Sequence, residues 1–532
     1  YLGLYPDVAR AGVNPLTHFL DNGAAEGRFS NAFEQAAIDL NGNGGADDFN
    51  EAAYRTTYAD VDAAIKAGTF TSAYQHFVQF GQFEGRVATL SNGTTITGPF
   101  ANSGTVPGAG NTFTLTEGQD VFQGTSGDDT FQGRFADLNG FDNVQGGAGN
   151  DTLNLFVGPN ATVAVPRTAT VSGIETINVI RNDAFTSTTA AAVNASGFQG
   201  AEAIWQIDNV GAITGLSSGQ TAGFRDASVD AAVTYVEGVT DANIALDNVA
   251  GDATINLNGA DLTTLTVSGS LTPVANVPEV LNLTFGATPT AAEGVLETLN
   301  LNLSADTTVT LGDVDFRSLT TVDASGSTGG ITVDLSGAGI TNNTLDVETI
   351  IGGSGNDVLT IEIGSLTAEA VTISGGAGND TITIAADVNG TTADASTTAS
   401  AVTITLGAGN DTIDVNALSN IVTATAAGVT AGLVTVTDFN ALQDVLDLSG
   451  LTNARDILTN TELANINGAT SLFDAVKAAD TATADNGYSV FNYAGDAYVF
   501  VDNGTAGLNA GDGLIKLVGF QVNQITDSNF VA

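Results

Sequence analysis

Three turns with the same pattern of glycine and aspartate follow one another in the second half of the chain. They read GGSGND from Gly352, GGAGND from Gly375 and LGAGND from Leu406, and each continues into a short run of β-branched residues. Glycines permit backbone conformations that bring carbonyl oxygens inward, and the aspartate adds one full negative charge. Such oxygens are the ligands that a hard cation such as Ca²⁺ prefers. The pattern therefore predicts calcium binding.

A single turn offers too few oxygens for calcium, which takes roughly six to eight. We therefore expect turns on adjacent rungs to share each ion, so that folding and calcium binding are one process. Further copies, GGAGND from Gly146 and the degraded GTSGDD from Gly124, favour this interpretation over the alternative that the motif is only a tight hairpin. The predicted metal ligands are Gly353, Gly355, Asp357, Gly376, Gly378, Asp380, Gly407, Gly409, Asp411, Gly147, Gly149, Asp151, Gly127 and Asp129.

Short strands must position these turns. An apolar residue follows the aspartate by two places in each of the three copies (Leu359, Ile382 and Ile413), and we expect it to point into the core of its rung. The uneven spacing of the turns then reflects the far sides of rungs of unequal length. The turns themselves are predicted to stack on one side of consecutive rungs.

Residues 113–450 have the texture of many similar short strands. Thr, Val, Ile, Leu, Asn and Gly dominate, and an apolar–Glu–Thr–apolar unit recurs at Ile174, Leu296 and Val347. Stacked repeats of this kind favour an elongated, calcium-stabilised β-solenoid or β-roll over the α/β sheet of an enzyme. The expected fold class is mainly β, with a small α-helical N-terminal repeat domain and a mixed C-terminal cap.

Residues 1–90 contain a duplicated unit. The segment from Tyr1 to Arg28 matches the segment from Tyr54 to Arg86. Both end in Glu-Gly-Arg, and His18 matches His76. Each copy is expected to form short helices closed by a glycine turn. Because Tyr1 falls inside the first copy, we expect the N-terminus to be trimmed or incomplete.

A loop between the two copies, residues 39–50, resembles a calcium-binding loop. Asp39, Asn41, Asn43 and Gly44 occupy its first, third, fifth and sixth positions, but the twelfth is not glutamate. A calcium site and an ordinary polar turn both remain open here, and the polar turn is favoured.

The rest of the chain divides by composition. Residues 91–112, rich in Gly, Thr, Pro and Ser, are expected to form a linker or an irregular first strand. Residues 113–450 form the β-rich region, and residues 451–532 form a C-terminal cap in which a helix precedes a β-hairpin.

Composition excludes several classes of function. The 532 residues carry a net charge of -46, which repels nucleic acid and anionic lipid and attracts cations. The chain has no cysteine and shows no long apolar run, so neither thiolate metal sites nor membrane insertion are expected. It has no HExxH motif, and both histidines lie in the N-terminal duplication. We therefore expect no enzymatic activity.

The glycine–aspartate turns resemble the RTX nonapeptide repeats of proteins exported by type I secretion. The segments LTEGQDVFQGTSGDDTF and VTDFNALQDVLDLSGL resemble RTX-type bacterial surface-layer proteins more than RTX enzymes, although long tandem nine-residue arrays are absent. The terminal DSNFVA is similar to an uncleaved type I secretion signal.

The resemblance implies a structural protein that binds Ca²⁺ and assembles with copies of itself into a two-dimensional surface layer (S-layer) on a Gram-negative cell. It also implies that residues 1–90 contact neighbours or anchor the layer to lipopolysaccharide or another surface glycan. The alternative is an RTX-type calcium-dependent adhesin or a subunit of an extracellular filament.

Overall fold

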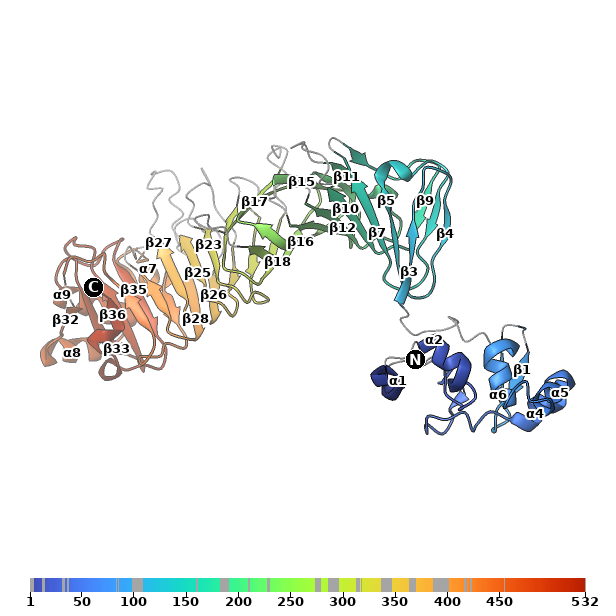
Figure 1. Ribbon diagram of the computed structural model, residues 1–532. Helices are drawn as coiled ribbons and strands as arrows, with labels where there is room; N and C mark the ends of the chain where they lie inside the picture. The colour runs from blue at the N-terminus through green and yellow to red at the C-terminus, as the bar shows by residue number, and fades with distance from the viewer. Residues whose placement is uncertain are drawn as a thin grey trace. The chain divides into compact units, whose positions relative to one another are not determined.

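The computed structural model divides the protein into two compact units (Figure 1). The first contains Tyr1–Gly110 with Thr125–Asp128, and the second contains Asn111–Gly124 with Asp129–Ala532. The fold is mainly β, as predicted. The structure describes the chain except for residues 1–3, 12–14, 31–33, 36–37, 83, 85, 98–108, 159–160, 182–190, 209–210, 227–229, 273–278, 286–295, 312–315, 317, 336–346, 363–369, 386–400, 416–417, 419, 422, 454 and 532.

Short helices build the first unit, in agreement with the duplication. Phe29, Tyr54 and Phe77 are buried in its hydrophobic core. Asn50 and Ser72 cap helices by accepting hydrogen bonds from backbone N–H groups three residues later. The elements are α1 (Pro6–Ala11), α2 (Pro15–His18), η1 (Phe19–Gly23), α4 (Glu51–Thr57), α5 (Ala59–Lys66), α6 (Ala73–His76), η2 (Phe77–Gly81), β1 (Val87–Thr89) and β2 (Thr95–Thr97).

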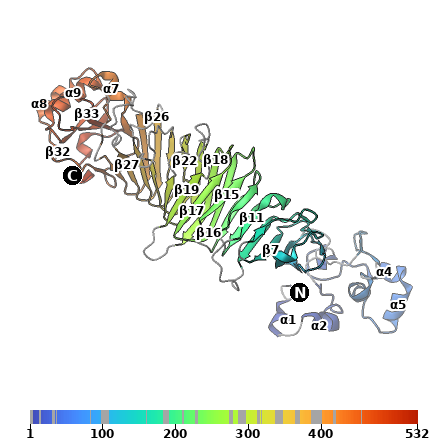
Figure 2. The same cartoon turned by 90° about the horizontal axis from the view of Figure 1, so that it is seen from above.

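Parallel strands stacked rung upon rung form a solenoid in the second unit (Figure 2). Along most of its length the strands alternate between two long sheets. The first sheet contains β3 (Ala109–Thr114), β5 (Asp128–Arg134), β7 (Thr152–Val157), β10 (Thr176–Arg181), β12 (Ala203–Ile207), β14 (Thr221–Arg225), β16 (Asp241–Ala250), β18 (Thr264–Thr272), β20 (Thr298–Leu303), β22 (Thr321–Asp323), β24 (Thr349–Ile351), β26 (Ala370–Ala377), β28 (Ala401–Ala408) and β30 (Val434–Val436).

The second sheet runs beside the first through the same rungs. It contains β8 (Thr162–Val163), β11 (Ala192–Asn194), β13 (Ile213–Leu216), β15 (Asp230–Tyr235), β17 (Asp252–Asn258), β19 (Val280–Phe285), β21 (Thr307–Leu311), β23 (Ile331–Leu335), β25 (Val358–Glu362), β27 (Thr381–Ala385), β29 (Thr412–Asp414), β31 (Val445–Asp447) and β36 (Phe530–Val531). A third, short sheet near the start of the solenoid contains β4 (Val121–Gln123), β6 (Asn143–Gln145) and β9 (Thr170–Ser172).

Alternate side chains of each strand fill the interior of the solenoid. One column in register from rung to rung contains Val333, Leu359, Ile382, Ile413 and Leu446. None of the five is more than 1% exposed. The predicted inward positions after the aspartates are therefore confirmed. Burial of each such side chain contributes about 1.5–3 kcal/mol, so the column stabilises the strands that carry the turns.

The repeated apolar–Glu–Thr–apolar unit marks the corner at which the chain enters the first sheet. Thr176, Thr298 and Thr349 are the first residues of β10, β20 and β24. Backbone hydrogen bonds join successive corners, as in the bond from Thr320 N–H to Glu297 C=O at 2.9 Å. The unit is therefore a stacking corner shared by several rungs.

A mixed cap closes the C-terminal end of the solenoid. Its strand β35 (Gly513–Leu517) pairs with β30, and β36 pairs with β31, so the last strand of each long sheet is covered. The predicted hairpin is formed by β33 (Tyr488–Tyr493) and β34 (Asp496–Val501). The remaining elements are η3 (Phe135–Asp137), η4 (Ala195–Gly197), α7 (Ala426–Ala431), β32 (Arg455–Asp456), α8 (Asn460–Asn467), α9 (Leu472–Ala482), η6 (Val522–Gln524) and η7 (Asp527–Asn529).

The helical segment expected at the start of the cap is divided into two helices. Gly468 ends α8, and the hydroxyl of Ser471 caps α9 by accepting from the N–H of Asp474 at 3.1 Å. Glycine at a helix end and serine as an N-cap separate the two helices.

Candidate metal centre

The three turns of the second half of the chain stack in register, as predicted. They connect β24, β26 and β28 of the first sheet to β25, β27 and β29 of the second. The backbone N–H of Asp357 donates to Oδ1 of Asp380 at 2.9 Å, and that of Asp380 donates to Oδ1 of Asp411 at 2.9 Å. The N–H of Asp411 donates to Oδ1 of Asp444 at 3.2 Å. These four aspartates form the C-terminal ladder.

Oδ2 of Asp380 is a buried carboxylate oxygen in this ladder that has no hydrogen bond to the described residues. Oδ1 of Asp357 accepts from the N–H of Ile331 at 2.6 Å, and its Oδ2 accepts from the N–H of Gly353 at 2.6 Å. Oδ2 of Asp380 has no hydrogen-bond partner within the described part of the chain, although Asp380 is only 1% exposed. A buried carboxylate oxygen without a donor is unfavourable, and a cation beside it would remove that penalty.

The first glycine of each intact turn faces a space bounded by acceptor oxygens. A Cβ atom on Gly375 would lie 2.5 Å from the carbonyl oxygen of Leu406 and 2.6 Å from Oδ2 of Asp380. A Cβ atom on Gly352 would lie 2.1 Å from the carbonyl oxygen of Gly375 and 2.5 Å from Oδ2 of Asp357. Carbonyl and carboxylate oxygens that lie this close together suit a hard cation, above all beside the unpaired Oδ2 of Asp380. The residues present therefore fit calcium.

Burial raises the pKa of every aspartate in the C-terminal ladder. It raises the pKa of Asp380 to about 6, and the nearby carboxylates of Asp357 and Asp411 act in the same direction. Burial also raises the pKa of Asp357, Asp411 and Asp444. Without a cation these aspartates therefore bind protons more readily in the folded ladder than in the unfolded chain, whereas a bound dication favours the ionised carboxylates.

The glycines of the turns are required for two different reasons. Gly353 and Gly355 approach the preceding rung closely, since Cβ atoms on them would lie 2.5 Å from the carbonyl oxygen of Ser327 and 2.3 Å from the carbonyl carbon of Gly329. All the other predicted glycines except Gly127 have a positive φ, which disfavours side chains. They are Gly147, Gly149, Gly376, Gly378, Gly407 and Gly409.

Leu406, which replaces the first glycine of the third turn, is accompanied by a new carboxylate. Its side chain is fully buried. The N–H groups of Leu406 and Gly407 donate to Oδ1 and Oδ2 of Asp438 at 2.8 and 2.9 Å. Sequence reasoning missed Asp438 and Asp444 because they follow β30 outside the nonapeptide spacing. Their position in the strand-like segment VTDFNALQDVLDL was the available signal.

The two turns near the start of the solenoid form a second column, the N-terminal ladder. The N–H of Asn111 donates to Oδ1 of Asp129 at 2.6 Å, and the N–H of Asp129 donates to Oδ1 of Asp151 at 2.7 Å. The N–H of Asp151 then donates to Oε2 of Glu175 at 2.7 Å. Glu175 therefore occupies the place of the next aspartate, although its repeated unit gave no sign of this. Gly127 belongs to the turn before Asp129, where its N–H donates to Thr125 Oγ1 at 3.1 Å.

The two ladders lie at different corners of the solenoid. Asp129 lies at the start of β5 and Asp151 directly precedes β7, so these turns lead into the first sheet. Asp357, Asp380 and Asp411 directly precede strands of the second sheet. The structure thus brings the predicted ligands together in two groups rather than one.

A further acidic pair, also missed, lies beside the N-terminal ladder. The N–H of Asp120 donates to Oδ1 of Asp142 at 2.9 Å. Oδ2 of Asp120 accepts from the N–H of Thr116 at 2.7 Å, and Oδ2 of Asp142 accepts from the N–H of Asn139 at 2.6 Å. The Gly-x-Asp sequences that end at Asp120 and Asp142 were the available signal.

The loop at residues 39–50 is closed by its own hydrogen bonds. The carboxylate of Asp39 accepts from the N–H groups of Asn43 at 3.1 Å and Gly44 at 2.9 Å. Asn50, at the twelfth position, accepts from the N–H of Ala53 at 3.0 Å and caps α4. These contacts agree with the polar-turn alternative, and the calcium alternative stays a prediction.

The arginines of the N-terminal duplication are engaged within the unit. Arg28 forms ion pairs with Asp7 at 2.8 Å and Glu26 at 2.7 Å, and its guanidinium lies 4.9 Å from the ring centroid of Tyr5. The second copy repeats this arrangement. Its residues are Tyr58, Asp60, Glu84 and Arg86. The matching Glu-Gly-Arg sequences therefore have a structural role in closing each copy.

Side chains alone do not assemble a metal site. Within the described residues, no group of three or more His, Cys, Asp or Glu side chains is arranged to hold a metal ion. Calcium in the ladders therefore depends on backbone carbonyl oxygens as well as aspartates.

No helix in the described part of the chain has the length and apolar character needed to cross a membrane.

Comparison with known families agrees with this geometry. The model of the RTX calcium-binding nonapeptide repeat (4 copies) matches residues 114–137, 137–155, 344–360, 367–383 and 395–422. These segments contain both ladders except for Glu175, Asp438 and Asp444. No curated protein matches the chain. The chain therefore carries RTX repeats, and the ion that these repeats bind is calcium.

Proposed function

We propose that the protein is a secreted structural protein that assembles with copies of itself into a calcium-dependent S-layer on the outer surface of a Gram-negative cell. The proposal rests on the two ladders of aspartates within one capped solenoid. Sites of this kind in extracellular modules fill at roughly 10⁻⁴ to 10⁻³ M calcium. The chain would thus complete its fold outside the cell, where calcium is abundant.

The charge of the chain supports a second role for calcium in this proposal. At a net charge of -46, copies of the protein repel one another. Divalent cations bound to the ladders and near the surface would lower this repulsion, so that assembly as well as folding would respond to calcium. Export through type I secretion, with the terminal DSNFVA as its signal, is part of the same proposal.

We propose a structural role rather than a catalytic one. His76 is 6% exposed, and its ring lies 5.0 Å from the ring of Phe70, which favours a packing role for this histidine. No histidine follows His76 in the sequence, and the chain contains no cysteine. A Ser-His-Asp triad or a zinc protease site in the solenoid would need such residues.

Residues 1–90 are proposed to anchor the layer to lipopolysaccharide or another surface glycan. Arg28 and Arg86 already pair with carboxylates, so their guanidinium groups are not free to bind the charged groups of a glycan. Deleting residues 1–90 should leave a protein that forms sheets but no longer stays on cells. Retention of the truncated protein on the cell surface would contradict this anchoring role.

Electron microscopy tests the assembly proposal. Purified protein should form ordered two-dimensional sheets in millimolar calcium and dispersed particles after chelation with EDTA, and the same lattice should cover the cells that produce it. Single particles in calcium, together with sparse copies on those cells that bind a target, would favour the adhesin alternative. Linear polymers in calcium would instead favour a filament subunit.

A further inference from the structure

Among the described residues of the second unit, the buried acidic side chains lie at the two ends of the solenoid and in its cap. Between Asp151 and Asp357, the polar side chains that the structure describes as buried are Gln206, Gln220, Thr307 and Ser327. All four are neutral. A buried carboxylate needs a cation or donors to offset its charge, whereas a neutral group needs only hydrogen bonds.

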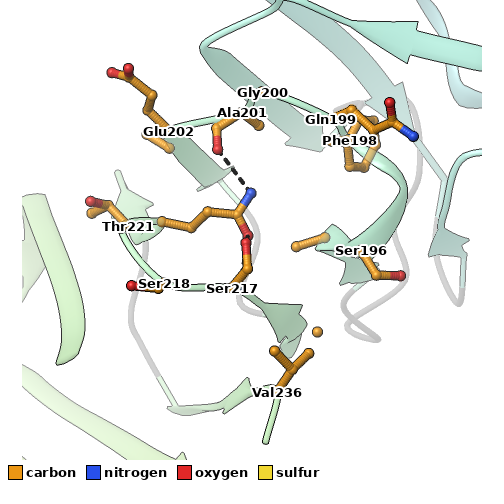
Figure 3. A pocket seen from close by; sticks show the side chains of 15 residues that line it. Ser196, Phe198, Gln199, Gly200, Ala201, Glu202, Ser217, Ser218, Thr221 and Val236 are labelled. Carbon is orange, nitrogen blue, oxygen red and sulfur yellow. Dashed lines mark hydrogen bonds between the residues drawn. The ribbon is translucent and has the colours of Figure 1, made fainter. Parts of the chain in front are cut away.

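Gln220 closes one rung corner in the way that a cation would close a corner of the ladders. Its Nε2 donates to the carbonyl oxygen of Ala201 on the preceding rung at 2.8 Å, the contact drawn as a dashed line at Ala201 in Figure 3. Its Oε1 accepts from the N–H of Ser217 at 2.9 Å and from the hydroxyl of Ser217 at 3.0 Å. One neutral side chain thus joins a carbonyl of one rung to the turn of the next.

The interior of the same region contains other neutral polar side chains. Nε2 of Gln206 donates to the carbonyl oxygens of Ala191 and Gly211, both at 3.0 Å. Oδ1 of Asn256 has no hydrogen-bond partner among the described residues. An unpaired neutral amide oxygen costs about 1–3 kcal/mol, which is less than the cost of an unpaired buried charge.

Six described rungs lie between the ladders; the last, β22 and β23, contacts Asp357 through the N–H of Ile331, and the other five pack continuously. These five are the pairs β12 and β13, β14 and β15, β16 and β17, β18 and β19, and β20 and β21. In the first sheet, Ile244, Val267 and Leu301 lie in register, and none is more than 1% exposed. Solenoid stability is approximately a sum of rung and nearest-neighbour terms, and a stable core needs about three or more repeats, a number that the five rungs exceed.

We propose that these five rungs, from β12 to β21, hold their fold without calcium, and that removing calcium releases only the ladders on either side. The proposal rests on the role of the ladders in calcium binding. It does not depend on lattice assembly. The solenoid would then contain a permanent middle segment and two calcium-responsive ends at different corners.

The single tryptophan of the chain reports on this middle segment. Trp205 lies in β12, and its ring covers Gly223 of the next rung so closely that a Cβ on Gly223 would lie 2.3 Å from a ring carbon. The guanidinium of Arg225 lies 4.7 Å from the ring centroid and pairs with Asp247 at 2.6 Å. Trp205 is half-buried, and unfolding of the middle segment would remove the cover that Gly223 and Arg225 give its ring.

The test uses the full chain in millimolar calcium and in EDTA. Tryptophan fluorescence should keep the same emission maximum in both buffers. Hydrogen exchange followed by mass spectrometry should show continued protection of residues 203–311 in EDTA, with fast exchange of residues 124–157 and 352–414. A shift of the emission to that of the denatured protein, with loss of protection in all rungs together, would overturn the proposal.

A pair of variants separates this idea from general damage. Gln220→Ala should speed exchange near its corner to the same extent in calcium and in EDTA, because no cation acts there. Gln199→Ala, at an exposed position in the pocket that Gln220 also lines (Figure 3), should leave exchange unchanged. An effect of Gln220→Ala that calcium reverses would contradict the proposal. If the protein formed no two-dimensional layer although the middle segment stayed folded, only the proposed lattice would be contradicted.

Discussion

Replacing Asp380 with asparagine should change stability in opposite directions with and without calcium. The pKa of Asp380 is raised from 3.8 to about 6 by burial, which corresponds to a cost of at most about 3 kcal/mol for the ionised form at neutral pH. Backbone donors and partial access of water reduce this to roughly 1–3 kcal/mol. In EDTA the Asp380→Asn protein should therefore be more stable than the wild type by that amount.

In calcium the sign should reverse. Asparagine keeps an oxygen that can accept from the N–H of Asp357, but it removes the charge that a dication requires. Its amide could instead donate to the carbonyl oxygen of Leu406, much as Gln220 bridges two rungs. The calcium midpoint for folding should rise. Asp357→Asn should raise it less, because both oxygens of Asp357 already accept hydrogen bonds.

Denaturant unfolding followed by far-ultraviolet circular dichroism, in EDTA and in millimolar calcium, measures both effects. Asp230→Asn is the control, since Asp230 is exposed and lies on β15 away from the ladders. If Asp380→Asn destabilised the protein equally in both buffers, Asp380 would be a structural residue and not a calcium ligand.

Three further outcomes follow from the same contacts. In EDTA, lowering the pH from 7 to about 4 should stabilise the C-terminal ladder. The pKa of Asp380 is higher in the folded protein than in the unfolded chain, so this stability is lost as the pH rises through about 6. Thermal unfolding at the two pH values checks this, and an unchanged midpoint would contradict it. Gly375→Ala should raise the calcium midpoint, since its Cβ would lie 2.6 Å from Oδ2 of Asp380, whereas Gly118→Ala should not. Equal midpoints in a calcium titration would show that the space beside Gly375 does not hold the ion. Phe530→Ala should destabilise the cap by about 3–5 kcal/mol, because Phe530 continues the buried column beyond Leu446 and lies 5.0 Å from the ring of Tyr488; an unchanged thermal midpoint would show that β36 does not close the solenoid.

The C-terminal ladder could be predicted because its chemistry and its periodicity lie in the same short motif. Glycines, one aspartate and an inward apolar residue repeat together at Asp357, Asp380 and Asp411, and parallel stacking then follows from the geometry of strands. The hydrophobic column through Leu359 and Ile382 could be predicted from the sequence for the same reason.

The assignment of each turn to a corner could not be predicted. The sequence before Asp151 and that before Asp380 are alike, yet one turn leads into the first sheet and the other into the second, because the third sheet adds a side to the early rungs. Glu175, Asp438 and Asp444 complete the ladders through contacts between rungs about 24–33 residues apart in sequence, which no local motif records.

The central claim is that calcium completes the fold through the stacked aspartate turns. A calcium titration of the purified full-length protein, followed by far-ultraviolet circular dichroism, tests it most directly. We expect the part of the strand signal that comes from the ladders to be lost in EDTA and regained cooperatively at roughly 10⁻⁴ to 10⁻³ M calcium, with the midpoint raised in the Asp380→Asn protein. Identical spectra and identical thermal stability in EDTA and in millimolar calcium would contradict the account.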